Sequence, residues 1–216
     1  MSSTPIESFY SEDIDSATDL PQKQKQVLKA CLELFASKGF EATTTADIAE
    51  KAGVSQGTVY KRFKTKDQLL HAVVQPLFSK TIPRAAKEFA EDIRQFKYDS
   101  LADFLKPTLM NRLTFGAENK QVIKILFMQA VNDQTLLAEL IGPVKDVLTN
   151  TIPVVLDELK KQHLLVAGTP RVSWSTSFQS EPAMGAQMVL FDRKFDLEHI
   201  IDQAVEFLVK GLSPEK

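Results

Sequence analysis

Apolar residues recur along most of the chain at spacings of three and four, which places them on one face of an α-helix. The segment after Pro21 shows this pattern most clearly, and Gly39 ends it. Its apolar face consists of Val27, Leu28, Cys31, Leu32 and Phe35. Further helices are expected over 83–96, 99–115, 119–141, 144–162, 171–191 and 196–211, separated by Pro83, Gly116, Gly142 and the run Gly168-Thr169-Pro170. Because no segment alternates with a period of two, the pattern predicts an all-α fold.

Charge is distributed unevenly along the chain. Residues 1–20 carry five acidic and no basic side chains and show no helical periodicity, so they are predicted to form a mobile acidic tail. Residues 21–80 carry ten basic against five acidic side chains, although the whole chain has a net charge of −2. A locally basic surface is what neutralisation of nucleic-acid phosphates requires.

Composition and length describe an ordinary globular protein, with 216 residues of which 44% are hydrophobic and 25% charged. This is enough chain for one domain or two closely packed ones. The longest stretch without a charge, Gln68–Ser79, is too short to span a membrane, and the N-terminus has no pattern of a secretion signal. Cys31 is the single cysteine and has no partner for an internal disulfide. We therefore expect a cytoplasmic protein with no membrane partner.

Residues 44–63, TTADIAEKAGVSQGTVYKRF, carry the signals of two short helices joined by a tight turn. Thr44 followed by Asp47 is typical of a helix start, because each side chain caps a backbone N–H of the other residue. Gly53 supplies the positive φ of a sharp exit, and Ser55 caps the second helix. Together they predict a helix-turn-helix, whose inward-facing apolar positions are Ile48, Ala49, Ala52, Val54, Val59 and Phe63.

The second of these helices presents amide, hydroxyl and basic side chains, the types that read base edges in the major groove of DNA. We expect Gln56 and Thr58 to read bases, and Gly57 to let the helix approach the DNA closely. Lys61 is expected to contact either guanine or a phosphate, and its residue type does not decide between them. The remaining expected contacts, at the helix N-terminus and along the phosphate backbone, are Thr44, Ser55, Tyr60, Arg62 and Lys66.

Residues 27–70, VLKACLELFASKGFEATTTADIAEKAGVSQGTVYKRFKTKDQLL, closely resemble the N-terminal DNA-binding domain of the TetR (tetracycline repressor) family of transcriptional regulators. The likeness rests on three motifs: LF-x3-GF, T-x3-IA-x2-AGVS and Y-x2-F-x2-K-x2-L. It covers about a fifth of the chain. By this likeness, the positions where family members touch DNA include Thr44, Gln56, Thr58, Tyr60, Lys61 and Lys66.

The resemblance implies a two-part architecture. A three-helix DNA-binding domain over 21–66 would be joined to a larger helical ligand-binding and dimerisation domain over 67–216. A small-molecule effector would shift the family's fourth helix and release a homodimeric repressor from a palindromic operator. The sequence departs from the family pattern at Pro76, which is expected to kink or shorten that fourth helix.

Candidate effector-binding residues are the large, soft or aromatic side chains of the C-terminal part, although plain core packing is the favoured explanation for each of them: Phe104, Met110, Phe115, Phe127, Met128, Trp174 and Phe178. The pair Trp174 and Phe178 lies in a stretch rich in Ser and Thr and suits either a planar ligand or a dimer interface. The three histidines are scattered, so neither a metal site nor any other cofactor is expected.

Two other functions are compatible with parts of this pattern. The first is a DNA-binding dimer of the same fold that is controlled by a protein partner, or that activates transcription without a small effector. A helical enzyme is the remote alternative, because the chain has no phosphate-binding glycine loop, zinc-protease motif or nucleophile elbow. The helices over 171–191 and 196–211 are expected to form the dimer surface.

Overall fold

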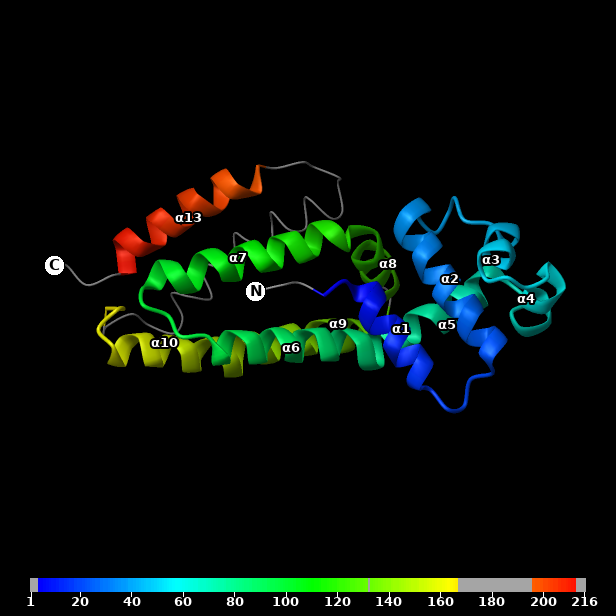
Figure 1. Cartoon of the computed structure of the whole chain (residues 1–216), viewed down its shortest axis with the longest axis horizontal. Helices are drawn as coiled ribbons and strands as arrows, with labels where there is room; N and C mark the ends of the chain where they lie inside the picture. Colours follow the sequence, from blue (N-terminus) through cyan, green and yellow to red (C-terminus); the bar gives the residue numbers. More distant parts are fainter. Residues whose placement is uncertain (1–3, 132, 167–195, 213–216) are drawn as a thin grey trace. The chain divides into compact units, whose positions relative to one another are not determined.

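The computed structural model describes residues 4–131, 133–166 and 196–212 (Figure 1). Every secondary-structure element in these ranges is a helix, which confirms the predicted all-α class. The packing divides the chain into two compact units. The N-terminal unit comprises residues 4–85 and 119–143, and the C-terminal unit comprises 86–118 and the described part of 144–216. No described helix is both long and apolar enough to cross a bilayer.

The N-terminal unit is built around α2, whose buried side contacts four neighbouring helices: α1, α3, α5 and α8. The five positions predicted as its apolar face are all buried, and α2 ends at Gly39 as expected. The helices of this unit are α1 (Ile6–Ser16), α2 (Gln22–Lys38), α3 (Thr45–Lys51), α4 (Gln56–Arg62), α5 (Lys66–Pro76), the π-helical turn η1 (Leu77–Thr81), α8 (Lys120–Ala130) and most of α9 (Gln134–Asp146).

Helix α1 corrects the prediction of a mobile tail over residues 1–20. Four apolar side chains of α1 are buried, and their spacing is helical: Ile6, Phe9, Tyr10 and Ile14. Among the acidic residues of α1, Asp15 is exposed and pairs with Lys29 at 2.6 Å. The backbone N–H of Ile6 donates to the buried side chain of Asn119 at 2.9 Å, which ties α1 to the start of α8.

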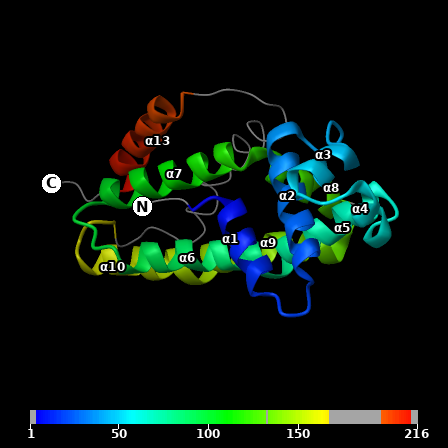
Figure 2. The ribbon, with the colours of Figure 1, turned by 45° about the vertical axis from the view of Figure 1, so that its right-hand side comes forward.

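The C-terminal unit contains most of α6 (Ile82–Gln95), α7 (Leu101–Glu118), the π-helical turn η2 (Val147–Thr151), α10 (Ile152–Lys161) and α13 (Leu197–Leu212). Helix α13 packs along α7, as Figures 1 and 2 show from two directions. Ile201 and Val205 of α13 are buried in this contact, and Lys106 pairs with Asp202 at 2.6 Å beside it.

Several predicted helix breaks are wrong. Gly116 lies inside α7, and Gly142 lies inside α9, which continues through η2 into α10. The real break precedes Gln134, where the side chain of Asp133 accepts the backbone N–H of Thr135 at 2.8 Å and so caps α9. Residues 119–143, predicted as part of the effector domain, pack in the N-terminal unit. The helix predicted over 171–191 lies outside the described residues, and that over 196–211 corresponds to α13.

The helical path does not end at Pro76, because the backbone there stays right-handed and passes into η1 and then α6. In η1 the N–H of Ile82 bonds to the carbonyl of Leu77, five residues back. Both π turns lie directly before an Ile-Pro pair, at Pro83 and at Pro153. In an α-helix each proline ring would clash with the carbonyl four residues earlier. The wider π turn removes this clash.

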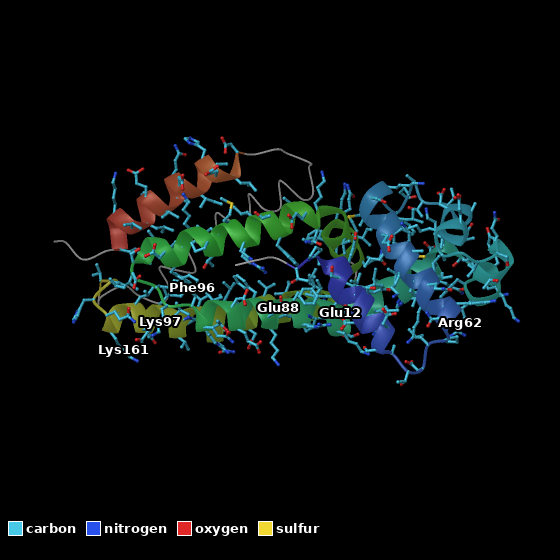
Figure 3. All side chains as sticks on the ribbon, in the orientation of Figure 1. Glu12, Arg62, Glu88, Phe96, Lys97 and Lys161 are labelled. Atoms are coloured by element: carbon cyan, nitrogen blue, oxygen red, sulfur yellow. The ribbon has the colours of Figure 1, made fainter. Side chains whose placement is uncertain are left out.

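Threonine hydroxyls are buried at the end of both π turns. Thr81 is fully buried and donates to Asp13 of α1 at 2.7 Å. Arg84 also bonds to Asp13, at 3.2 Å, and pairs with Glu12. Figure 3 labels Glu12 on α1. Thr151 is fully buried in the C-terminal unit and accepts from Arg94 at 2.8 Å. The hydrogen bond from Thr81 to Asp13 fixes α1 against η1 in the N-terminal unit.

Replacement of Thr81 by valine keeps the side-chain shape and removes this hydroxyl. We expect Thr81→Val to lower the free energy of unfolding by about 1–2 kcal/mol, because the half-buried carboxylate of Asp13 loses a hydrogen bond. The control is Ser79→Ala in the same turn, where an exposed hydroxyl bonds to the carbonyl of Gln75. Urea denaturation of both variants checks this, and an equal loss in the two would contradict the assigned role of Thr81.

Candidate nucleic-acid interface

Helix α3 starts with the capping box predicted from Thr44 and Asp47. The Thr44 hydroxyl accepts the N–H of Asp47 at 3.1 Å, and the Asp47 carboxylate accepts the N–H of Thr44 at 2.9 Å. The backbone hydrogen bond from Thr44 holds the pKa of Asp47 below its ordinary value. Lys51 pairs with Glu33 at 2.7 Å and thereby links the far end of α3 to α2. Helix α3 is thus fixed at both ends.

The turn between α3 and α4 has the geometry that the sequence predicts. Gly53 has a φ of 65°, a left-handed conformation that residues with a Cβ adopt at a cost. The N–H of Val54 bonds to the carbonyl of Ala49 at 3.0 Å and closes the turn. Ser55 then caps α4, since its hydroxyl accepts the N–H of Thr58 at 3.2 Å.

Helix α4 divides into a buried and an exposed side. Val59 is 1% exposed and Phe63, its C-cap, is 7% exposed, so both predicted inward positions are confirmed. Thr58 is half-buried, and its hydroxyl lies 2.9 Å from that of Ser55. The other predicted DNA-contacting residues of α4 are all exposed: Gln56, Gly57, Tyr60, Lys61 and Arg62. Helix α4 therefore presents a continuous polar and basic face to solvent.

Gly57 lies on this exposed face near the start of α4. A Cβ at this position would meet a single described atom within 4 Å, the Ser55 hydroxyl oxygen at 3.7 Å, which is an ordinary contact. Its φ is not in the left-handed range that favours glycine. The fold of the domain therefore does not require glycine at position 57.

Two of the predicted phosphate contacts also have partners inside the protein. The Tyr60 hydroxyl lies 2.9 Å from that of Thr45, which joins α4 to α3. The Lys66 ammonium donates to the carbonyl of Glu41 at 3.1 Å and lies 4.3 Å from the Phe40 ring centroid. Lys66 thus helps to hold the loop between α2 and α3.

Two further exposed or half-exposed residues beside these were not predicted as part of the DNA-contacting surface. Thr45 is the partner of Tyr60, and the Thr-Thr-Thr run over 43–45 contained the signal for it. Lys64 follows α4 and adds an exposed positive charge next to Lys61 and Arg62. Arg62 is at the C-terminal end of α4 (Figure 3).

The predicted effector-binding residues do not form one described cluster. Phe104 is fully buried in the core of the C-terminal unit, and Met110 packs against that core. Phe115 lies 4.8 Å from the guanidinium of Arg112. The exposed residues Phe127 and Met128 belong to α8 of the N-terminal unit, and the structure does not describe Trp174 and Phe178. The packing role is thereby confirmed for Phe104.

A groove of about 860 Å³ lies elsewhere on the C-terminal unit. It is formed by the end of α6, the loop over 96–99 and α10, and the predicted effector residues do not line it. Figure 3 shows Phe96, Lys97 and Lys161 at this end of the unit. Within the described ranges no set of three His, Cys, Asp or Glu side chains is placed to hold a metal ion.

Residues 27–73, which include α3, the turn and α4, match the family model described as "Bacterial regulatory proteins, tetR family". This part of the chain is a DNA-binding domain of the TetR type. The matched region begins inside α2 and ends inside α5 of the TetR-family domain.

Individual TetR-family relatives extend the likeness in two ways. The HTH-type transcriptional regulator YvkB of Bacillus subtilis is 46% identical over 50 residues, but these cover 23% of this chain and 26% of YvkB. This chain therefore aligns with about a quarter of that relative's length. The fatty acid metabolism regulator protein of Bacillus subtilis is 24% identical over 191 residues, which cover 88% of this chain and 95% of that protein.

The fold of the whole chain also has counterparts among solved structures. The transcriptional regulator FadR from Bacillus subtilis, solved in complex with stearoyl-CoA, superposes with a TM-score of 0.56. The match covers 86% of this chain and 97% of FadR at 22% sequence identity. This likeness extends the shared fold beyond the DNA-binding domain into the C-terminal helices.

Two glycines of the helix-turn-helix are expected to respond oppositely to alanine. Gly53→Ala should lower the free energy of unfolding by about 1–2 kcal/mol, because its φ is left-handed. Gly57→Ala should raise it by up to about 1 kcal/mol, because alanine favours the helix and its Cβ has room. Chemical denaturation of both variants measures this. An unchanged stability in Gly53→Ala would show that the turn relaxes away from the described geometry.

Proposed function

We propose that this chain is a homodimeric, sequence-specific DNA-binding regulator of transcription of the TetR family, and that it acts as a repressor released from a palindromic operator by a small-molecule effector. The observation that carries this proposal is the exposed face of α4, where amide, hydroxyl and basic groups surround a glycine that the fold does not require. Such a face suits insertion into the major groove of DNA.

The individual roles within this face remain those expected from the sequence. Gln56 and Thr58 read base edges, and Gly57 allows the backbone of α4 to approach the DNA. Lys61 contacts guanine or a phosphate. The phosphate contacts come from Thr44, Ser55, Tyr60, Arg62 and Lys66. Since Lys66 and Tyr60 also hold the protein together, Arg62 is the cleaner residue for testing a pure phosphate contact.

A homodimer suits the reading of DNA, because two recognition helices about 34 Å apart fit successive major grooves on one side of the duplex. Phe207 of α13 supports a partner on this helix, since this residue is 77% exposed while Ile201 and Val205 face α7. A largely exposed aromatic residue is the kind of side chain that a second copy would cover.

The effector class is suggested by the relatives. One full-length relative is a fatty acid metabolism regulator, and FadR of similar fold binds stearoyl-CoA. These likenesses support a small effector with an apolar portion. Control by a protein partner, or activation without an effector, stays the alternative, which the residues of α4 leave equally open.

Selection of bound duplexes from randomised DNA by the purified full-length protein, at a stated salt concentration, tests the proposal. We expect recovery of a site with two related half-sites in inverted orientation. Failure of folded, dimeric protein to enrich any sequence would contradict DNA reading in the effector-free state. Addition of acyl-CoA to the selected complex then separates release by an effector from the alternatives.

Two α4 variants should separate base reading from phosphate contact on this operator. Gln56→Ala should change the ranking of operator variants, with about 1–3 kcal/mol lost at one base position. Arg62→Ala should weaken binding to all sequences alike and reduce the salt dependence by about one phosphate contact. Fluorescence anisotropy over a salt series measures both. Equal losses on every operator variant for Gln56→Ala would remove its role as a base reader.

A further inference from the structure

Arg112 is a cation placed among aromatic rings of the C-terminal unit. Its guanidinium carbon lies 3.6 Å from the ring centroid of Phe89 on α6 and 4.8 Å from that of Phe115 on α7. The side chain is half-buried, and burial lowers the pKa of Arg112 to about 10, an effect that the charge of Asp92 opposes. The cation is therefore held where water solvates it poorly.

The hydrogen-bond donors of Arg112 are incompletely matched. A guanidinium has five N–H groups. Within the described ranges, Nε and Nη2 both donate to the same acceptor, the side-chain oxygen of Asn111, with Nε at 2.9 Å. No carboxylate oxygen of a described residue lies within 4.0 Å of the guanidinium. The charge is stabilised by aromatic faces and one neutral amide, and several of its donors have no acceptor among the described residues.

A second unmatched polar group lies one helical turn before Arg112. Thr108 is 3% exposed, and its hydroxyl has no hydrogen-bond partner within the described part of the chain. Asn111 is 6% exposed, so both polar side chains are embedded in the unit. Positions 108, 111, 112 and 115 lie on one side of α7 because of the helical repeat. Other cations of this unit differ, since Lys106 pairs with Asp202 at 2.6 Å and Arg94 bonds to Thr151 at 2.8 Å.

These contacts describe a positively charged position in an apolar environment, with a single neutral acceptor among the described residues. A half-buried cation and a buried hydroxyl whose hydrogen bonds the described residues leave incomplete each cost free energy that a suitable ligand recovers. The planar fork of a guanidinium matches the two oxygens of a carboxylate or phosphate. The rings of Phe89 and Phe115, and the core residues around them, suit an apolar body attached to that head group.

We propose that Arg112, Asn111 and Thr108 form the anchor for the oxyanion of an organic effector, whose apolar part lies against Phe89 and Phe115. The proposal rests on the function proposed above and specifies the chemistry of its effector: a carboxylate or phosphate head on a hydrocarbon body. Arg112 supplies the charge and the paired donors. Thr108 supplies a hydroxyl that gains an acceptor when the anion binds.

Direct binding tests this without DNA. Dodecanoate, dodecyl phosphate and dodecanol share one hydrocarbon chain, and each is titrated below its aggregation concentration into the full-length protein by calorimetry. We expect at least one anion to bind about ten-fold or more tightly than the alcohol, as expected for charge-assisted hydrogen bonds. The better of the two anions distinguishes a carboxylate source from a phosphate source. Equal affinity of both anions and the alcohol, or no binding of any of them, overturns the anchor.

The variant Arg112→Met keeps the length and apolar contacts of the side chain and removes the charge. It should lose about ten-fold or more of the anion affinity and leave the alcohol unchanged. Lys97→Met is the matched control, because Lys97 is an exposed cation of the same unit and its loss should change neither. Unchanged anion affinity in Arg112→Met would overturn the proposal. Thr108→Val should reduce anion affinity by a smaller factor, about two- to five-fold.

Thermal unfolding of the ligand-free protein gives a readout that does not depend on the probe. An unmatched buried cation destabilises the ligand-free state, so Arg112→Met should raise Tm by about 2–4 °C. A structural role for the cation between the two rings predicts the opposite, and a lower Tm in Arg112→Met would overturn the anchor. Operator binding of the same variants without ligand is measured separately, so a failure of DNA reading is distinguished from a failure of the anchor.

Discussion

The buried side of α2 is the contact on which the N-terminal unit depends. Four helices pack against it, and among them α3 is held both by apolar contact and by the ion pair between Lys51 and Glu33. Helix α4 takes its position from α3 through the turn at Gly53 and through the hydroxyl contact between Tyr60 and Thr45. The exposed face of the recognition helix is therefore oriented by a rigid support rather than by its own seven residues.

The parts of the structure that were predicted best are those that depend on interactions between residues close together in the sequence. The helix-turn-helix was predicted almost residue by residue, because a capping box, a left-handed glycine and a second cap act within a few residues. Helix α1 was missed although Ile6, Phe9, Tyr10 and Ile14 have helical spacing, because the acidic residues of its outer face dominated the composition. The cap at Asp133 was likewise overlooked in favour of Gly142, which a helix tolerates.

The effector residues were least predictable, since their roles depend on packing between distant segments. Phe104 and Phe127 look alike in sequence, yet one is fully buried and the other is 38% exposed. The more informative signal in α7 was polar: Thr108 and Asn111 are buried, and Arg112 is half-buried. Polar side chains at core positions lower stability unless their hydrogen bonds are completed, so their presence indicates a constraint other than packing. These polar residues of α7 were not predicted as effector contacts, because the candidates were chosen among aromatic and other large apolar side chains.

The π turn η1 has a consequence for how this chain tolerates changes in length. A π turn holds one residue more than an α turn, because its hydrogen bond reaches back five residues instead of four. Deletion of a single residue from Leu77–Thr81 would return this segment to regular α geometry. The ring of Pro83 would then clash with the carbonyl four residues before it. The extra residue thus makes the length of this segment as restrictive as its composition.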